Sequence, residues 1–209
     1  MNFLAHIFLS GDDRKIQVGN FIGDAVKGSA YKDYPQPMAG GILLHRAIDI
    51  FTDNHPAVKE TVRSMRPVFG RYSGILLDIY FDYLLASRFD EFTQIPLKKF
   101  SRRFYFSLIR NRRYLPDRIK RFMWHFITTD RLGKYADTEG IRESLEIMVK
   151  YKHIVISPEE SIKYLIGHEK ELLAVFRPFF SELQAYCTGW REQRISGSPE
   201  ERLETKNDV

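Results

Sequence analysis

Residues 73–89 read SGILLDIYFDYLLASRF, and as a helix this stretch is apolar around almost its whole circumference. A helix without a polar face is normally buried, so we expect it at the centre of a bundle. Its apolar part is about a dozen residues, interrupted by Asp78 and Asp82, whereas a membrane-spanning helix needs roughly 20. The stretch therefore predicts a globular helical core and no transmembrane segment.

Helical periodicity extends over the rest of the chain, and the only strand-like run is Ile154-Val155-Ile156. Capping aspartates and first-turn prolines mark where helices begin. The expected helices are 12–27, 37–53, 56 onward, 73–89, 96–113, 116–129, 138–152 and 158–191, the last with or without a break at Pro178. We predict an all-α, single-domain bundle of about eight helices over residues 1–195, followed by a disordered tail over residues 196–209.

Composition narrows the class of protein. The chain has 209 residues, of which 44% are hydrophobic, and this is enough for one domain or two small ones. The single cysteine, Cys187, excludes internal disulfides and multi-cysteine zinc or iron–sulfur sites. The apolar opening at residues 1–10 has neither a preceding basic stretch nor a small-residue cleavage site. We therefore expect a cytoplasmic protein.

Positive charge is concentrated in residues 98–121, which hold ten basic residues and one acid, although the formal net charge of the chain is only +5. Such a field attracts an acidic partner, whether nucleic acid, anionic lipid or an acidic protein. The aromatic residues interleaved with these charges are Phe100, Phe104, Tyr105, Phe106, Tyr114, Phe122 and Trp124. They fit a binding surface and the buried faces of the same helices about equally well.

Polar residues on otherwise apolar helices indicate chemistry, because a buried carboxylate is costly unless a positive charge compensates it. Four segments present metal-ligand side chains, all within the first 82 residues: His6; Asn20 and Asp24; His45, Asp49, Thr52 and Asp53; and Asp78 and Asp82. Within each helical segment the spacing of four, seven or eight residues puts these side chains on one face.

Imidazoles and carboxylates without a thiolate suit Mn²⁺, Mg²⁺ or Fe²⁺ better than a structural zinc. An ion of this kind activates water and polarises a phosphoryl oxygen, and Lys27 and Arg46 would neutralise the developing charge. The pattern favours metal-assisted hydrolysis of a phosphoester. The alternative is structural, with Asp78 and Asp82 paired to arginines and His6 a hydrogen-bonded core histidine.

Four motifs follow in order along residues 1–90: MNFLAH at 1–6, GNFIGD at 19–24 with Lys27-Gly28, HRAID at 45–49 with FTD at 51–53 and His55-Pro56, and Gly74-Ile75 to Phe81-Asp82. Together they resemble the acyl carrier protein phosphodiesterase family. Beyond residue 90 only helical character and length agree.

The resemblance implies an HD-like helical fold and hydrolysis of the phosphodiester between phosphopantetheine and a serine of holo-acyl carrier protein, usually with Mn²⁺. The products would be apo-carrier protein and 4′-phosphopantetheine. By motif position the site would contain His6, Asp24, His45, Asp49, Asp53, Asp78 and Asp82.

We assign roles within this site as hypotheses. The metal would bind His6, Asp24, His45 and Asp78, with Asp49 and Asp82 as ligands or orienting residues. Lys27 and Arg46 would hold the phosphate, and His55 would protonate the leaving oxygen. Family members often carry an Asp-His pair where this chain has Asp82-Tyr83, so the acid role would fall to Tyr83 or His55.

An acidic carrier protein would give the basic segment a function in docking. The docking residues we expect are Lys98, Lys99, Arg102, Arg103, Arg110, Arg112 and Arg113. One alternative is a different HD-like phosphohydrolase acting on a nucleotide or small phosphoester, although the sequence has no glycine-rich phosphate loop. Another is a non-catalytic binder of nucleic acid through the basic, aromatic segment.

Overall fold

The computed structural model describes residues 2–152 and 154–196, and within them twelve α-helices and four short 3₁₀ turns but no strand. The helices are α1 (Phe3–Leu9), α2 (Arg14–Phe21), α3 (Gln36–Asn54), α4 (Pro56–Phe69), α5 (Ser73–Ser87), α6 (Phe89–Phe92), α7 (Leu97–Arg110), α8 (Asp117–Thr128), α9 (Arg131–Lys134), α10 (Thr138–Lys152), α11 (Pro158–Gly167) and α12 (Glu169–Ser196). The 3₁₀ turns are η1 (Gly23–Ala25), η2 (Gly28–Asp33), η3 (Gly70–Tyr72) and η4 (Arg112–Tyr114). The all-α class is confirmed, with more and shorter helices than the eight expected.

Helix α5 is the central element. Residues 79–86 are all buried, because a helix that is apolar on every side removes that surface from water only by packing on every side. Helices α1, α4, α10 and α12 all contact it. The position expected for this stretch is confirmed.

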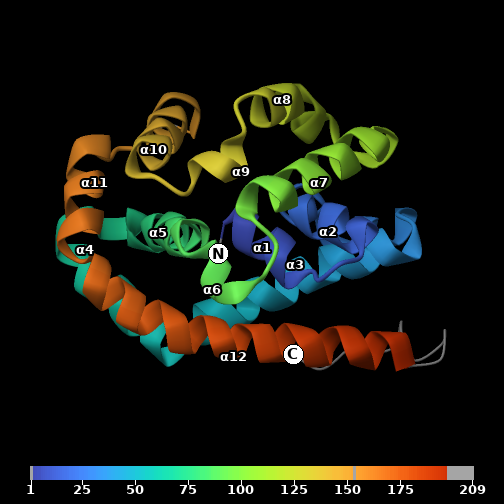
Figure 1. The fold of residues 1–209 in the computed structure, drawn as a ribbon, viewed down its shortest axis with the longest axis horizontal. Coiled ribbons are helices and arrows are strands. Elements are labelled where there is room, and N and C mark those ends of the chain that lie inside the picture. Colours follow the sequence, from blue (N-terminus) through green and yellow to red (C-terminus); the bar gives the residue numbers. More distant parts are fainter. Residues whose placement is uncertain (1, 153, 197–209) are drawn as a thin grey trace.

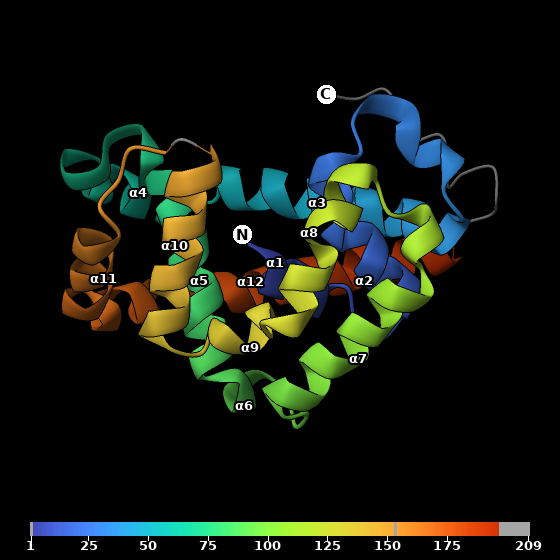
Figure 2. The same ribbon diagram turned by 90° about the horizontal axis from the view of Figure 1, so that it is seen from above.

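The other helices divide between two ends of the molecule. Helices α2, α7 and α8 gather at one end and α4, α10 and α11 at the other, while α3 runs from the α2 end toward α4, as both views show (Figures 1 and 2). The long helix α12 runs along one side and connects the ends (Figure 1). Its Cys187 is buried in the core.

Two boundaries differ from the sequence expectation. Helix α2 begins after an Asp13 cap, as predicted, but ends at Phe21, so that Asp24 lies on η1. The helix expected over 158–191 divides between Gly167 and Glu169, whereas Pro178 lies inside α12. Helix α12 reaches Ser196, and the tail expected beyond it lies outside the described residues.

The tightest helix pair is α2 with α3, and glycines make it possible. A Cβ on Gly19 would lie 2.1 Å from the Met38 carbonyl oxygen, and one on Gly41 would lie 2.2 Å from the Ile16 carbonyl oxygen. Both contacts are with backbone, which cannot move aside as a flexible side chain can. The close approach brings Asn20 of α2 against His45 of α3.

No helix among the described residues has both the length and the apolar content of a bilayer-spanning segment.

Candidate functional site

Two buried imidazoles form the centre of the candidate site. His6 of α1 and His45 of α3 stack with their ring centroids 4.0 Å apart. Asn20 of α2 lies against both rings: its Oδ1 is 2.9 Å from Nδ1 of His6 and 3.2 Å from Nδ1 of His45. Its Nδ2 donates to the His6 carbonyl oxygen and to Ser10 Oγ, each at 2.9 Å. Three short stretches of sequence thus meet at one amide.

The Asn20 network fixes the protonation of the rings. Because Nδ2 donates to two acceptors, the atom that faces the histidines is the amide oxygen, which only accepts hydrogen bonds. Each Nδ1 must therefore carry a proton, and in a neutral ring Nε2 keeps its lone pair. The two Nε2 atoms are presented as electron-pair donors.

Carboxylates face these two nitrogens. Asp49 of α3 places Oδ1 3.2 Å from His6 Nε2 and Oδ2 3.2 Å from His45 Nε2, and Asp24 Oδ1 lies 3.5 Å from His45 Nε2. Both Nε2 atoms are buried, yet neither makes an aligned hydrogen bond. The ligand atoms of His6, His45 and Asp49 all lie within 4.8 Å of one another. The lone pairs of the two Nε2 atoms therefore face those of the carboxylate oxygens, and a proton or a cation between them stabilises this arrangement.

The pKa values show how the group balances its charge without a cation. Burial and the neighbouring His45 lower the pKa of His6 to about 4. Burial also opposes the charging of His45, but the Asp24 and Asp49 carboxylates outweigh it and raise its pKa to about 9. Burial works against the charge of Asp49, yet both imidazoles hold its pKa well below the ordinary range. Contact with His45 likewise lowers the pKa of Asp24.

Asp53 and Asp78 are not members of the three-residue group that contains His6, His45 and Asp49. Asp53 is exposed on α3, and its pKa is raised by burial and by the charges of Asp78 and Asp49. The two carboxylates are thus electrostatically coupled to the site. Of the four residues expected to bind the metal, His6 and His45 belong to this group, and so does Asp49, which was expected as a ligand or an orienting residue. Metal binding by Asp24 and Asp78 stays a prediction.

Asp82, which was expected as a ligand or an orienting residue, contacts the backbone at the start of α1. It is fully buried, and its two oxygens accept the backbone N–H groups of Leu4 at 2.8 Å and Ala5 at 3.2 Å. Burial raises the pKa of Asp82 to about 7, although these two N–H groups favour the ionised form. Because both oxygens are engaged at the start of α1, Asp82 orients the helix that carries His6.

The expected acid residues lie elsewhere. His55 Nε2 is 3.2 Å from Glu182 Oε2 of α12, and its ring packs edge-on against Phe179. The Tyr83 hydroxyl donates to Glu169 Oε1 at 3.4 Å. Both side chains are directed at α12, so the structure does not support the protonation of a leaving group by either.

Of the two expected phosphate ligands, Lys27 lies between η1 and η2, and Arg46 of α3 reaches the same segment with its side chain. Arg46 Nη2 donates to the backbone carbonyls of Val26 at 3.0 Å and Gly28 at 2.7 Å. Lys27 is exposed, with its Nζ 4.0 Å from Asp24 Oδ1. Arg46 therefore fastens the segment that carries Asp24 and Lys27, a role that the sequence did not indicate.

The seven basic residues expected to dock a partner are all exposed on α7 and η4. The interleaved aromatics divide between the two interpretations left open above: Phe104 and Tyr105 are buried, whereas Phe106 and Trp124 are exposed. The first two therefore belong to the buried faces of the helices, and a binding surface that includes the second two stays a prediction.

Gly23 offers a test of the site's geometry. A Cβ at Gly23 would lie 2.3 Å from His45 Cγ, so Gly23→Ala should displace His45 from Asn20 and weaken Mn²⁺ binding about tenfold or more while the helix content is retained. Calorimetric titration with Mn²⁺ and circular dichroism measure the two effects. Gly40→Ala is the matched control, because a Cβ there meets no atom within 4 Å. Unchanged Mn²⁺ affinity in Gly23→Ala would contradict this geometry.

Comparison with known proteins agrees with the motifs. The family model described as acyl carrier protein phosphodiesterase matches residues 1–183. Proteins named acyl carrier protein phosphodiesterase are similar along most of their length. The one from Enterobacter sp. (strain 638) is 30% identical over 88% of this chain and 95% of its own length. The one from Yersinia pestis is 27% identical over 86% of this chain and 94% of its own length. A protein of the same name from Escherichia coli O139:H28 is 28% identical over 90% of this chain and 98% of its own length. No solved structure matches this chain. The chain belongs to the acyl carrier protein phosphodiesterase family.

Proposed function

We propose that this protein hydrolyses, in the cytoplasm, the phosphodiester that joins phosphopantetheine to a serine of holo-acyl carrier protein. The products are apo-carrier protein and 4′-phosphopantetheine, and the reaction uses a divalent cation, with Mn²⁺ as the first candidate and Mg²⁺ or Fe²⁺ as alternatives. The names of the relatives support the substrate. The observation that carries the chemistry is the pair of buried, unbonded Nε2 atoms that face the Asp49 carboxylate.

These residues fit a hard or borderline cation. Donor atoms that bind one ion octahedrally at about 2.1 Å lie about 3 Å apart, close to the 3.2 Å between each Nε2 and its Asp49 oxygen. The donor set is two imidazoles and a carboxylate, without thiolate, as suits Mn²⁺. We propose His6, His45 and Asp49 as ligands and Asp24 as a fourth. When bound, the cation supplies acidified water and polarises a phosphoryl oxygen.

The side chains around the proposed cation site orient its ligands and bind the substrate. Asn20 holds both rings with Nε2 directed at the Asp49 carboxylate, and Asp82 fixes the start of α1. Asp24 lies at the solvent-facing edge, with 78% of its side chain exposed, and so has access to an incoming substrate. We assign the binding of a phosphoryl oxygen to Lys27, which is exposed beside Asp24. A structural relationship to the HD-type phosphohydrolases stays a prediction.

The test of the proposed function measures the mass of the carrier protein after incubation. Purified protein incubated with holo-carrier protein and Mn²⁺ should lower the mass of the carrier by that of its phosphopantetheine group, whereas a chelator should stop the reaction and added Mn²⁺ should restore it. Nucleotides and small phosphomonoesters serve as a comparison panel. An unchanged carrier mass, in a buffer where an unrelated manganese phosphodiesterase works, would refute the proposal, and turnover of a nucleotide alone would favour the small-substrate alternative.

A further inference from the structure

Two neighbouring hollows follow helix α7. One, of about 370 Å³, is lined by Lys98, Lys99, Arg102 and Arg103. The other, of about 410 Å³, shares Lys98 and Arg102 and continues between α7 and the end of α8. Because they share two residues, they form one surface. We call the second hollow the α7 groove, defined by Lys98, Arg102, Phe106, Ile109, Ile127 and Asp130.

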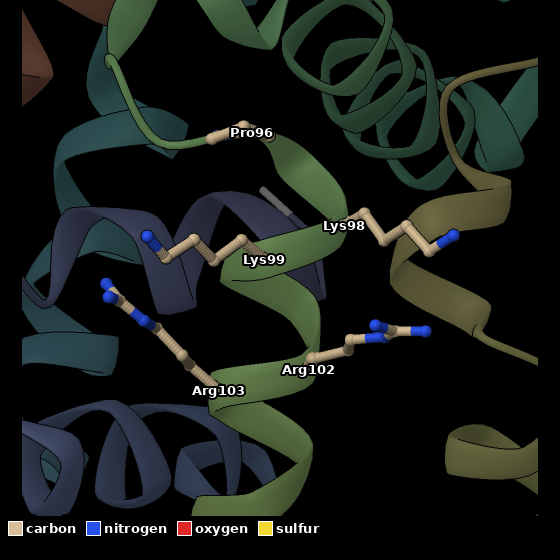
Figure 3. A pocket seen from close by; sticks show the side chains of 5 residues that line it. All are labelled: Pro96, Lys98, Lys99, Arg102 and Arg103. Carbon is tan, nitrogen blue, oxygen red and sulfur yellow. The ribbon is translucent and has the colours of Figure 1, made fainter.

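One end of the α7 groove is cationic. Lys98 and Arg102 extend to one side of α7, and Lys99 and Arg103 extend to the other (Figure 3). No acidic side chain in the described part of the chain forms an ion pair with any of these four residues. Unpaired, exposed cations leave their field available to a partner, and their i, i+4 spacing matches that of two carboxylates on a partner helix.

The other end of the groove is apolar. Phe106 and Ile109 continue the stripe of Lys98 and Arg102 along α7 and are 55% and 41% exposed. Ile127 of α8 lines the opposite side. Exposed large apolar side chains beside a charged rim are typical of a protein interface. Phe106 offers one ring on which a base could stack, but the two isoleucines beside it offer none, and this favours the apolar side chains of a peptide over a run of stacked bases.

A buried hydrogen-bond network makes the groove rigid. The Tyr105 hydroxyl donates to Asp130 Oδ1 at 2.9 Å and accepts the Leu132 N–H at 2.8 Å. Asp130 has a left-handed backbone, with φ 46°. Its bonded oxygen faces Tyr105, and it forms no ion pair with Lys98 or Arg102. A preformed groove costs less ordering entropy on binding.

We propose that the α7 groove docks an acidic amphipathic helix of the carrier-protein substrate. Carboxylates on that helix pair with Lys98 and Arg102, and its apolar side chains insert between Phe106, Ile109 and Ile127. The stripe from Lys98 to Ile109 spans about 16 Å at 1.5 Å per residue, the length of about three helical turns. The identity of the partner rests on the proposed function, and the proposal assigns docking to the groove and not to the Arg110–Arg113 end of the basic segment.

The experiment separates docking from chemistry. We compare wild type with Phe106→Ala/Ile109→Ala and with Lys98→Glu/Arg102→Glu. Three assays are run. They measure kcat and KM for holo-carrier protein, the hydrolysis of bis(p-nitrophenyl) phosphate, and the binding of labelled apo-carrier protein by fluorescence anisotropy. The matched control is Lys163→Glu/Ile166→Ala on α11, which makes the same kinds of change at the opposite end of the molecule (Figure 2).

We expect each groove variant to raise KM and the apo-carrier Kd about tenfold, with kcat and small-diester hydrolysis unchanged and the control like wild type. Added salt should weaken wild-type binding more than that of Lys98→Glu/Arg102→Glu. Groove variants that behave like wild type, while Arg110→Glu/Arg112→Glu raises KM, would overturn the assignment. A wild type that binds carrier protein through the groove without hydrolysing it would support docking and refute the proposed function. Groove-dependent binding of single-stranded DNA, with none of carrier protein, would overturn both.

Discussion

Asp49→Asn is expected to lower kcat/KM for holo-carrier protein by at least about a hundredfold, because losing even an outer partner of a metal ligand typically costs 10- to 100-fold, and Asp49 faces both imidazoles directly. Asparagine keeps the size and one oxygen but removes the negative charge. Mn²⁺ affinity should fall with activity, as calorimetric titration would show.

The same substitution has a signature that needs no substrate. With Asp49 neutral, one of the two carboxylates that raise the pKa of His45 is gone, so the pKa of that ring should fall from about 9, measurable by NMR in the metal-free protein. Asp12→Asn, at an exposed position away from the histidines, is the control. Full Mn²⁺ binding and turnover in Asp49→Asn would remove the metal site from the proposal.

The second large effect is a pH-dependent stability that bound Mn²⁺ removes. The folded pKa of His45 is about 9, above the ordinary 6.5, so its contribution is complete below pH 6.5 and is lost as the pH rises through 9. The shift of about 2.5 units corresponds to roughly 3 kcal/mol. His6 acts oppositely: its folded pKa of about 4 makes it destabilising as the pH falls below 6.5. Asp82 acts in the same direction as His45, because its folded pKa of about 7 lies above the ordinary 3.8, and it offsets His6 between about pH 4 and 6.5. The metal-free protein should therefore change little in stability over that range and lose stability above pH 6.5.

Mn²⁺ should flatten this slope above pH 6.5, because the proton that the metal displaces is the one that the folded His45 ring otherwise retains. A metal at Nε2 displaces the His45 proton, so affinity rises with pH and ligand-linked stabilisation rises with it. Urea midpoints between pH 6.5 and 8.5, with Mn²⁺ or with chelator, measure both slopes. His45→Gln should lose the decline and the metal response together. Parallel curves with and without Mn²⁺ in the wild type would contradict a site at these residues.

The sequence predicted the fold class because hydrophobic pattern is a local property. The apolar character of α5 around almost its whole circumference indicated its central position, and the Asp13 cap and Pro56 marked helix starts that the structure confirms. The opening segment was not expected to be helical, since α1 is only seven residues long and its start is satisfied by Asp82, far along the chain. The sequence offered two positions for a break in the last long helix, Gly167 and Pro178. The proline is the stronger helix-breaking signal, but the helix divides near Gly167 and α12 continues through Pro178.

The sequence indicated which residues lie near the site better than it indicated what each of them does there. Ligand-type residues on apolar helices pointed to His6, His45 and Asp49, and the structure brings these together. Roles depend on which atoms meet, and spacing along a helix does not show this: Asp82 and Asp78 are four residues apart, yet the first caps α1 and the second influences Asp53. The sequence placed Asn20 among the candidate residues but did not show that its amide joins both imidazoles. An amide beside the apolar Phe21 was a signal that it is buried.

A single amide joined to two imidazoles makes three positions interdependent. Loss of either ring would remove one of the two N–H donors to a buried acceptor, and loss of the amide would release both rings to the other tautomer. Natural substitutions at residues 6, 20 and 45 should therefore be inherited as a set, and covariation among relatives would record the coupling.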